Sequence, residues 1–462
     1  MRTGILPNAL CAGLLCASIA LAEAPSLVAI RDARIFVGNG TVIEKGTVLI
    51  RDGLISEVGT SVNVPASAWV VEGVGLMVYP GLIDGLSSWG IPQTATTTQN
   101  AGGRAGGGAP GLQALVQGQT PGQPAAQRSR GPEDRPGTTS WVHAADLVSP
   151  TDRRMEQARS AGFTTAVTFP RTGMIAGHGA VVNLGGERPN SMIVHPSAGL
   201  YLSMSTQNNG YPNSLLGVIA YIRQVWLDVD HYRMAKDMYA KNPVGMQRPE
   251  YDRALEGVME ANRILLPAVS KVQISRMIKF GKELKTPSIL YGAHEGYRAA
   301  DILAAAKLPV LVSLRWPTKA RDTDPEDEDD YDTLELRDKA PTTPAVLAKA
   351  GVKFAFFTDT VETPREAIRA VKRAIDSGLS REAALRALSL GAAEIYGVAD
   401  RLGSVEKGKI ANIVVTKADI FDDRPQVQMI FVDGVKYDPA PETPTAPGGM
   451  GQRPTNAPGE EK

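Results

Sequence analysis

Short runs of alternating apolar and polar residues mark both ends of the chain. Residues 27–72 alternate in this way, and the dipeptides Asn39-Gly40 and Asp52-Gly53 lie between the runs. These dipeptides favour hairpins, because their residues tolerate the positive φ angles that tight turns require. A matching pattern returns in residues 403–416 and 427–436. We therefore expect one small β-sandwich domain built from both chain ends, residues 23–79 and 400–437.

The middle of the chain alternates between extended and helical patterns. Strand-like apolar runs separated by stretches of helical length are typical of parallel βα units. The predicted strands are residues 78–84, 163–169, 264–266, 288–291, 310–314 and 354–357, and the predicted helices are 152–162, 215–241, 272–284, 297–306 and 363–377. This repetition predicts an α/β fold, a (β/α)8 TIM-like barrel over residues 80–399, although the pattern does not distinguish all eight strands.

The first residues have the pattern of a secretory signal peptide. Arg2 precedes an apolar run, and Ala20-Leu21-Ala22 forms a small-x-small cleavage site. The run is shorter than the roughly 20 residues that a membrane span needs. We therefore expect residues 1–22 to be removed and the mature protein to be periplasmic or extracellular.

Composition narrows the possible chemistry. Both cysteines, Cys11 and Cys16, lie in the predicted signal peptide, so the mature chain has no disulfide, thiolate ligand or cysteine nucleophile. A lipid anchor on Cys16 is disfavoured, because Leu15 stands where a small residue is expected. The 49 basic residues equal the 49 acidic ones, so no overall field favours nucleic acid or an anionic membrane.

Three segments have a biased composition. Residues 94–137 are rich in Gly, Pro and Gln and predict a flexible insert, either a spacer or a lid over the barrel mouth. Residues 321–332 are strongly acidic and lack the glycine and terminal glutamate of an EF-hand, so we favour a solvated loop over a calcium site. Residues 438–462 predict a disordered tail.

Candidate chemistry lies just after the predicted strands, because the βα loops of such barrels converge on one rim. His178, His294 and Asp359 follow three of these strands and form a nitrogen, nitrogen and oxygen set that suits zinc with a bound water. Arg315 follows a fourth strand and is a candidate for binding a substrate carboxylate. His143, His195 and His231 are predicted to be structural or exposed.

Several segments resemble the amidohydrolase superfamily, in its imidazolonepropionase-like branch. The similar segments are Pro-Gly-Leu-Ile-Asp at 80–84, residues 162–186, residues 351–359 and residues 384–417. The resemblance implies a metal-dependent hydrolase acting on non-peptide or cyclic C–N bonds. It also implies that Asp359 is a metal ligand and general base, and it places His294 near the ligand position of the sixth strand. Such an enzyme takes a small-molecule substrate.

The chain departs from that family where metal ligands are expected. The His-x-His pair after the first strand is replaced by Leu86 and Ser88, and residues 265–269 contain no histidine for the fifth strand. An alternative is therefore a protein without metal or catalysis that binds a ligand, forms a homo-oligomer or pairs with an active paralogue. A carbohydrate- or peptidoglycan-associated module is a weaker one. Asp359 could also cap the next helix through Thr360 or Thr363, and His178 could be purely structural.

Overall fold

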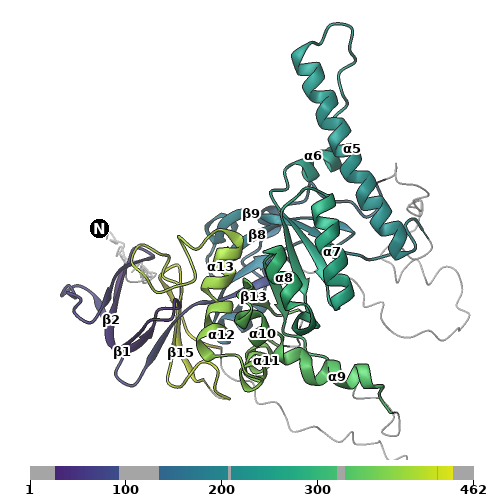
Figure 1. Cartoon of the computed structure of the whole chain (residues 1–462). Coiled ribbons are helices and arrows are strands. Elements are labelled where there is room, and N and C mark those ends of the chain that lie inside the picture. The colour runs from purple at the N-terminus through teal and green to yellow at the C-terminus, as the bar shows by residue number, and fades with distance from the viewer. Residues whose placement is uncertain are drawn as a thin grey trace, which may run out of the picture.

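The computed structural model describes residues 26–92, 135–206, 210–319, 328–359, 361, 363–423 and 425–440. Figure 1 shows a small β domain beside a larger domain of strands surrounded by helices. The predicted signal peptide, most of the 94–137 insert, most of the acidic segment and nearly all of the tail lie outside the described residues.

The β domain contains strands from both chain ends, as the alternation predicted. Its strands pair in the order β16-β15-β14-β5-β1-β2-β3, and β4 also pairs with β1. Asp52 and Gly53 have φ angles of 50° and 81°, which confirms the turn between β2 and β3. The strands are β1 (Leu27–Phe36), β2 (Val42–Arg51), β3 (Leu54–Gly59), β4 (Trp69–Glu72), β5 (Met77–Pro80), β14 (Ile413–Thr416), β15 (Val427–Val432) and β16 (Val435–Tyr437).

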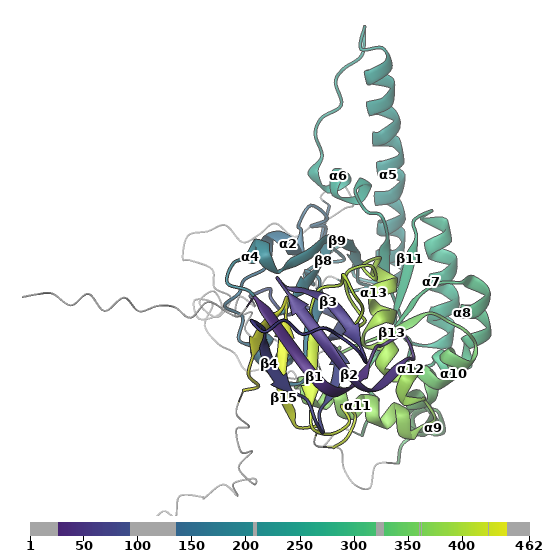
Figure 2. The ribbon, with the colours of Figure 1, turned by 90° about the vertical axis from the view of Figure 1, so that its left-hand side faces the viewer.

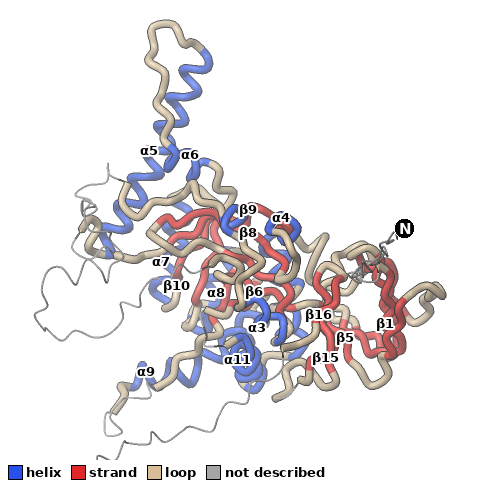
Figure 3. The backbone as a smooth tube through the Cα atoms, turned by 180° about the vertical axis from the view of Figure 1, so that it is seen from behind, coloured by secondary structure: helices blue, strands red, loops and turns tan. Residues whose placement is uncertain are grey.

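The larger domain is an eight-stranded barrel with an outer layer of helices (Figure 3). Its strands pair in the sequence order from β6 to β13. The first and last strands of this order, β6 and β13, lie against each other. They approach so closely that a Cβ added to Gly85 would lie 2.9 Å from the Phe356 carbonyl oxygen. The strands are β6 (Leu82–Ser87), β7 (Phe163–Thr168), β8 (Ile175–Asn183), β9 (Ile193–Leu202), β10 (Ile264–Ala268), β11 (Ser288–Gly292), β12 (Val310–Ser313) and β13 (Phe354–Phe357).

The barrel differs from the expected parallel arrangement at β8. This strand runs antiparallel to both β7 and β9, whereas β9 to β13 and the β6–β7 pair are parallel. A parallel connection needs a crossover of about a dozen residues or more, and the segments on either side of β8 are shorter than that. The chain therefore folds back twice, and residues 175–183 form a strand where we expected a strand-end loop.

Helices cover the outside of the barrel and extend beyond it. α5 (Leu215–Lys241) has the predicted bounds and projects far from the barrel in Figures 1 and 2. In the described part of the chain, no helix is both long enough and apolar enough to cross a bilayer. Besides α5, the described helices are α2 (Ala144–Leu147), α3 (Arg154–Ser160), α4 (Pro189–Met192), α6 (Arg253–Met259), α7 (Lys271–Glu283), α8 (Ala300–Ala306), α9 (Tyr331–Lys339), α10 (Thr343–Lys349), α11 (Pro364–Asp376), α12 (Arg381–Ala387) and α13 (Leu390–Tyr396). Short 3-10 helices span Gly296–Arg298 and Ala340–Thr342.

A buried amide joins the two domains. The side chain of Asn412, just before β14, donates to Asn183 Oδ1 of β8 at 2.8 Å and lies 3.0 Å from Thr165 Oγ1 of β7. Its own oxygen accepts from the Asp433 backbone N–H at 2.8 Å. These bonds satisfy polar groups at a junction that would otherwise bury them without partners.

Replacing Asn412 with alanine should lower the free energy of unfolding by about 1–3 kcal/mol, because it leaves buried polar groups unpaired. Urea denaturation followed by circular dichroism measures this. The exposed Asn190 is the matched control, and its alanine variant should stay within about 0.5 kcal/mol of the natural chain. Equal losses in the two variants would contradict a role for the junction.

A second buried polar group closes the barrel. Asp84 of β6 is fully buried, and its carboxyl group accepts from the Thr358 backbone N–H at 3.0 Å and the Thr358 hydroxyl at 2.7 Å. Burial raises the pKa of Asp84 to about 6, although these hydrogen bonds favour the ionised form. The first and last strands of the barrel are thus joined through a carboxyl group that is costly to ionise.

This pKa shift predicts a pH dependence of stability. Between about pH 4 and pH 6 the unfolded state has lost the Asp84 proton and the folded state still holds it, so stability falls as pH rises, by about 3 kcal/mol in all. Above about pH 6 the effect is constant.

The Asp84→Asn substitution should remove this decrease in stability between about pH 4 and pH 6 and keep the contacts to Thr358. The test is urea denaturation from pH 4 to pH 7.5, with Asp301→Asn at an exposed site as the control. The prediction is wrong if the Asp84→Asn and natural chains lose stability in parallel over this range.

Candidate functional site

Three of the predicted site residues come together at the carboxyl ends of neighbouring strands. Asp359 follows β13, Arg315 follows β12 and His294 follows β11. The Ser313 hydroxyl donates to Asp359 Oδ2 at 2.7 Å and accepts from the Arg315 backbone N–H at 3.0 Å. His294 Nε2 lies 2.9 Å from the Arg315 carbonyl oxygen. A continuous set of hydrogen bonds therefore fixes the three residues relative to one another.

Asp359 adopts a backbone conformation that is uncommon for residues other than glycine. Its φ angle is 47°, in the left-handed region, where aspartate is tolerated better than most residues. The carboxyl group is directed to Ser313. Thr363 caps α11, with its side chain accepting from the Glu366 N–H, so Asp359 is not the cap. Such local strain is found often at functional sites.

The surroundings of His294 define its protonation. A carbonyl oxygen only accepts, so Nε2 carries the proton that it donates to Arg315, and Nδ1 of the neutral ring keeps a lone pair. Burial lowers the pKa of His294, and the nearby Asp359 carboxylate opposes part of that shift. The ring is therefore neutral at pH 7 with an acceptor atom available.

Arg315 lies at the same edge. Its side chain is exposed, and the described residues offer its guanidinium no carboxylate within ion-pair distance. A planar guanidinium binds carboxylates through two parallel hydrogen bonds. The predicted role in binding a substrate carboxylate is thus compatible with its position.

The structure does not bring His178 to this group. His178 lies in the antiparallel strand β8, and its register partner Leu200 belongs to the apolar layer between strands and helices. Paired residues on neighbouring strands point to the same side of the sheet. The His178 ring therefore faces outward, where its Nε2 lies 2.7 Å from the carbonyl oxygen of Gly257 in α6. His143 and Glu260, not Asp359, are the titratable groups that act on it.

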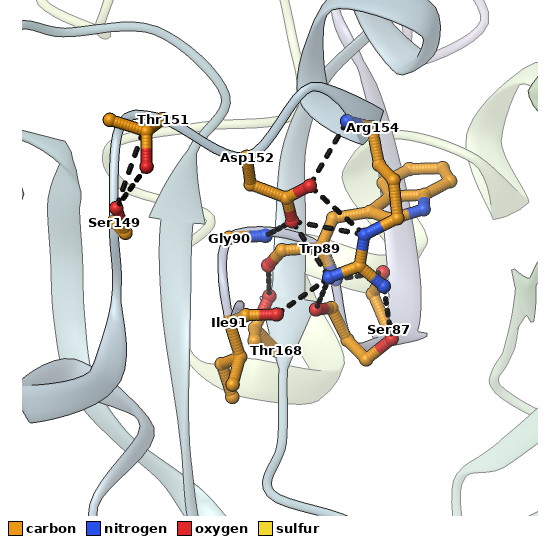
Figure 4. A network of polar contacts seen from close by, with 10 residues as sticks. Ser87, Trp89, Gly90, Ile91, Ser149, Thr151, Asp152, Arg154 and Thr168 are labelled. Atoms are coloured by element: carbon orange, nitrogen blue, oxygen red, sulfur yellow. Dashed lines mark hydrogen bonds and ion pairs between the residues drawn. The ribbon is translucent and has the colours of Figure 1, made fainter. Parts of the chain in front are cut away.

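Arginines contact both positions where the family has its first histidine pair. Leu86 is buried, and its carbonyl oxygen accepts from Arg171 at 3.0 Å. Ser88 accepts from Arg154 through its hydroxyl at 3.1 Å and its carbonyl oxygen at 2.9 Å. Figure 4 shows Arg154 held beside Asp152, which pairs with it at 2.7 Å.

Asp152 keeps Arg154 in place. Burial of Asp152 disfavours its charge, but hydrogen bonds from Arg154 and from the Gly90 N–H outweigh burial and lower its pKa. The resulting ion pair holds the guanidinium against the end of β6, where it also donates to the Ile91 carbonyl oxygen at 2.6 Å.

Arg171 was not predicted from the sequence as a site residue. It follows β7, and its guanidinium carbon lies 5.9 Å from the centre of the Tyr201 ring. Its Nε is buried and has no partner in the described part of the chain. Burial raises the pKa values of Tyr291 and Asp84, and the Arg171 charge opposes both shifts. The one available signal was its position two residues after a predicted strand.

These contacts test whether the strand ends can hold the metal that the family implies. Zinc sites normally use three or more protein ligands. Leu86 offers no side-chain donor, Ser88 is occupied by Arg154, and Leu265 fills the fifth-strand position as part of the apolar barrel interior. The Arg171 guanidinium at the end of β6 would also repel a divalent ion. The residues at the strand ends do not fit the metal of the family.

Several solved protein structures are similar to this chain. An amidohydrolase from Thermotoga maritima MSB8 has a TM-score of 0.69 and 25% identity, covering 89% of this chain and 100% of that one. A molinate hydrolase has a TM-score of 0.52 and 14% identity, covering 90% and 95%. A candidate prolidase from Bifidobacterium longum has a TM-score of 0.51 and 15% identity, covering 91% and 97%.

Sequence comparison points the same way as the fold. No protein with a curated description matches the chain significantly. The model described as "Amidohydrolase family" matches residues 145–436, which include His294, Arg315 and Asp359. The match spans more than half of the sequence, and the chain therefore belongs to the amidohydrolase family.

Proposed function

We propose that the protein hydrolyses a C–N bond, other than a peptide bond, in a small molecule that carries a carboxylate. The observation that carries this proposal is the hydrogen-bonded group of Asp359, His294 and Arg315 at the ends of β11, β12 and β13. Membership of the amidohydrolase family supports hydrolase chemistry. Because the strand ends do not fit the family's metal, the reaction is assigned to the side chains alone.

Asp359 and His294 handle the proton in this scheme. Asp359 Oδ1 is not engaged by Ser313 and accepts a proton from water as the water oxygen attacks the amide carbon. The neutral His294 ring accepts a hydrogen bond from the same water through Nδ1. The proton then passes to the departing nitrogen as the C–N bond breaks.

The two arginines complement negative charge. Arg315 binds the substrate carboxylate at the rim. Arg171, with a buried N–H that has no acceptor among the described residues, supplies positive charge for the oxygen of the tetrahedral intermediate.

Asp359→Asn and His294→Ala should each lower kcat by about 100-fold or more, as expected for loss of a general base or its water-positioning partner. Release of the free amino acid from N-acetyl amino acids, with the purified mature protein, is the measurement. His231→Ala, at an exposed position on α5, is the control and should keep full activity.

The pH profile gives an independent check. Burial lowers the pKa of His294. The decrease of kcat/KM at low pH should therefore have an apparent pKa below the ordinary imidazole value of about 6.5. Treatment with a chelator should leave the rate unchanged. A rate that depends on added metal, or one that survives both substitutions, would overturn this mechanism.

A second function is favoured by one specific observation, the loss of the first histidine pair to Leu86 and Ser88. In this alternative the protein binds the same carboxylate ligands without turnover, alone or beside an active paralogue. Calorimetry with N-acetyl amino acids separates the two. Binding without amine release, lost in Arg315→Met and kept in Asp359→Asn, identifies a binding protein.

Export and assembly are further proposals that rest on the sequence. We propose that the chain is exported after cleavage at Ala22 and that copies associate or pair with a paralogue. N-terminal sequencing of the periplasmic fraction and light scattering of the mature protein test the two proposals.

A further inference from the structure

A second group of potential metal ligands lies outside the barrel, away from the strand-end site. His143 precedes α2, His178 lies in β8, and Glu260 follows α6. One ligand atom from each of the three falls within 4.8 Å of the others. Residues far apart in the sequence are therefore gathered by the packing of three separate elements.

His178 is oriented as metal-binding histidines commonly are. The side chain is buried, with 1% of its surface exposed, and Nε2 donates to the Gly257 carbonyl oxygen at 2.7 Å. A carbonyl partner on one ring nitrogen fixes the tautomer and leaves the other nitrogen with its lone pair for a metal.

The backbone holds His143 beside it. His143 and His178 form an isolated parallel bridge, and the His178 N–H donates to the Val142 carbonyl oxygen at 2.8 Å. The two rings are stacked with centroids 4.7 Å apart. The stacking keeps the two imidazoles side by side on the same face of β8.

The close packing of α6 on residues 140–143 places the Glu260 carboxylate beside the two histidines. A Cβ on Gly257 would lie 2.5 Å from the Ser140 carbonyl carbon, so only glycine lets the helix pack this closely on the 140–143 segment. The Ser140 hydroxyl also bonds to the Ala254 carbonyl oxygen at 2.5 Å. Glu260, at the end of the same helix, is thereby placed with Oε2 3.4 Å from His143 Nε2.

We infer that His143, His178 and Glu260 form a binding site for a divalent transition metal, best matched by zinc. Two imidazoles and one carboxylate are a known zinc set, with water as the fourth ligand. Zinc bonds of about 2.0–2.1 Å place tetrahedral ligand atoms about 3.3 Å apart, close to the His143–Glu260 separation. Side chains of His143 and Glu260 are 33% and 59% exposed, so they can close on an ion while buried His178 stays fixed.

The experiment is zinc titration of the mature, full-length protein after dialysis against a chelator. Calorimetry should show one zinc per chain. His143→Ala and Glu260→Gln, both at partly exposed positions that tolerate change, should weaken binding by on the order of 100-fold or more. His231→Ala, another exposed histidine, should bind zinc as the natural chain does. Cobalt substitution gives a second readout, a visible absorption band that disappears in His143→Ala.

Two results would overturn the inference. One is absence of zinc binding by the natural chain, which would leave the group as a stacked histidine pair with Glu260 Oε2 3.4 Å from His143 Nε2. The other is binding that persists in His143→Ala and is lost in Asp359→Asn or His294→Ala, which would move the ion to the strand ends. Because amine release is not part of this experiment, its outcome is independent of the proposed hydrolase activity.

Discussion

The contact between Asp84 and Thr358 is the interaction on which the candidate site depends. It joins the first barrel strand to the residue after the last one, through two donors on Thr358 and one buried carboxyl group. Asp359 is the next residue, so its position after β13 is set by the same contact. A nearby bond from the Tyr396 hydroxyl to the Gly85 carbonyl oxygen, at 2.6 Å, ties α13 to the same closure. These contacts offset only part of the burial cost of the ionised carboxyl group, because the pKa of Asp84 is still raised to about 6.

Arginine side chains contact the end of β6. Arg154 and Arg171 donate to the oxygen atoms of Ser88 and Leu86, which a divalent cation would otherwise approach. Guanidinium groups keep their charge at every physiological pH and bring their own directional donors. The barrel mouth therefore combines a carboxylate, a neutral imidazole and guanidinium groups. The chain has the family's barrel, with Leu86 and Ser88 in place of the expected histidine pair after its first strand.

The antiparallel strand β8 separates two sets of potential ligands. It turns His178 outward, against α6, and away from the mouth where His294 and Asp359 lie. The same turn brings His178 beside His143, which no local pattern would have associated with it. Two chemically distinct sites can therefore occupy one barrel, one at the strand ends and one between β8 and its covering helix.

The sequence by itself determined the two domains, the bounds of α5 and most barrel strands, because periodicity and turn residues act locally. It also determined which residues follow β11, β12 and β13, and parallel strands necessarily bring those residues to one edge. Only the tertiary structure decided the direction of β8, the arginine contacts to Leu86 and Ser88, and the grouping of His143 with Glu260. Those features depend on which residues distant in the chain meet after packing, and hydrophobic periodicity carries no information about such meetings.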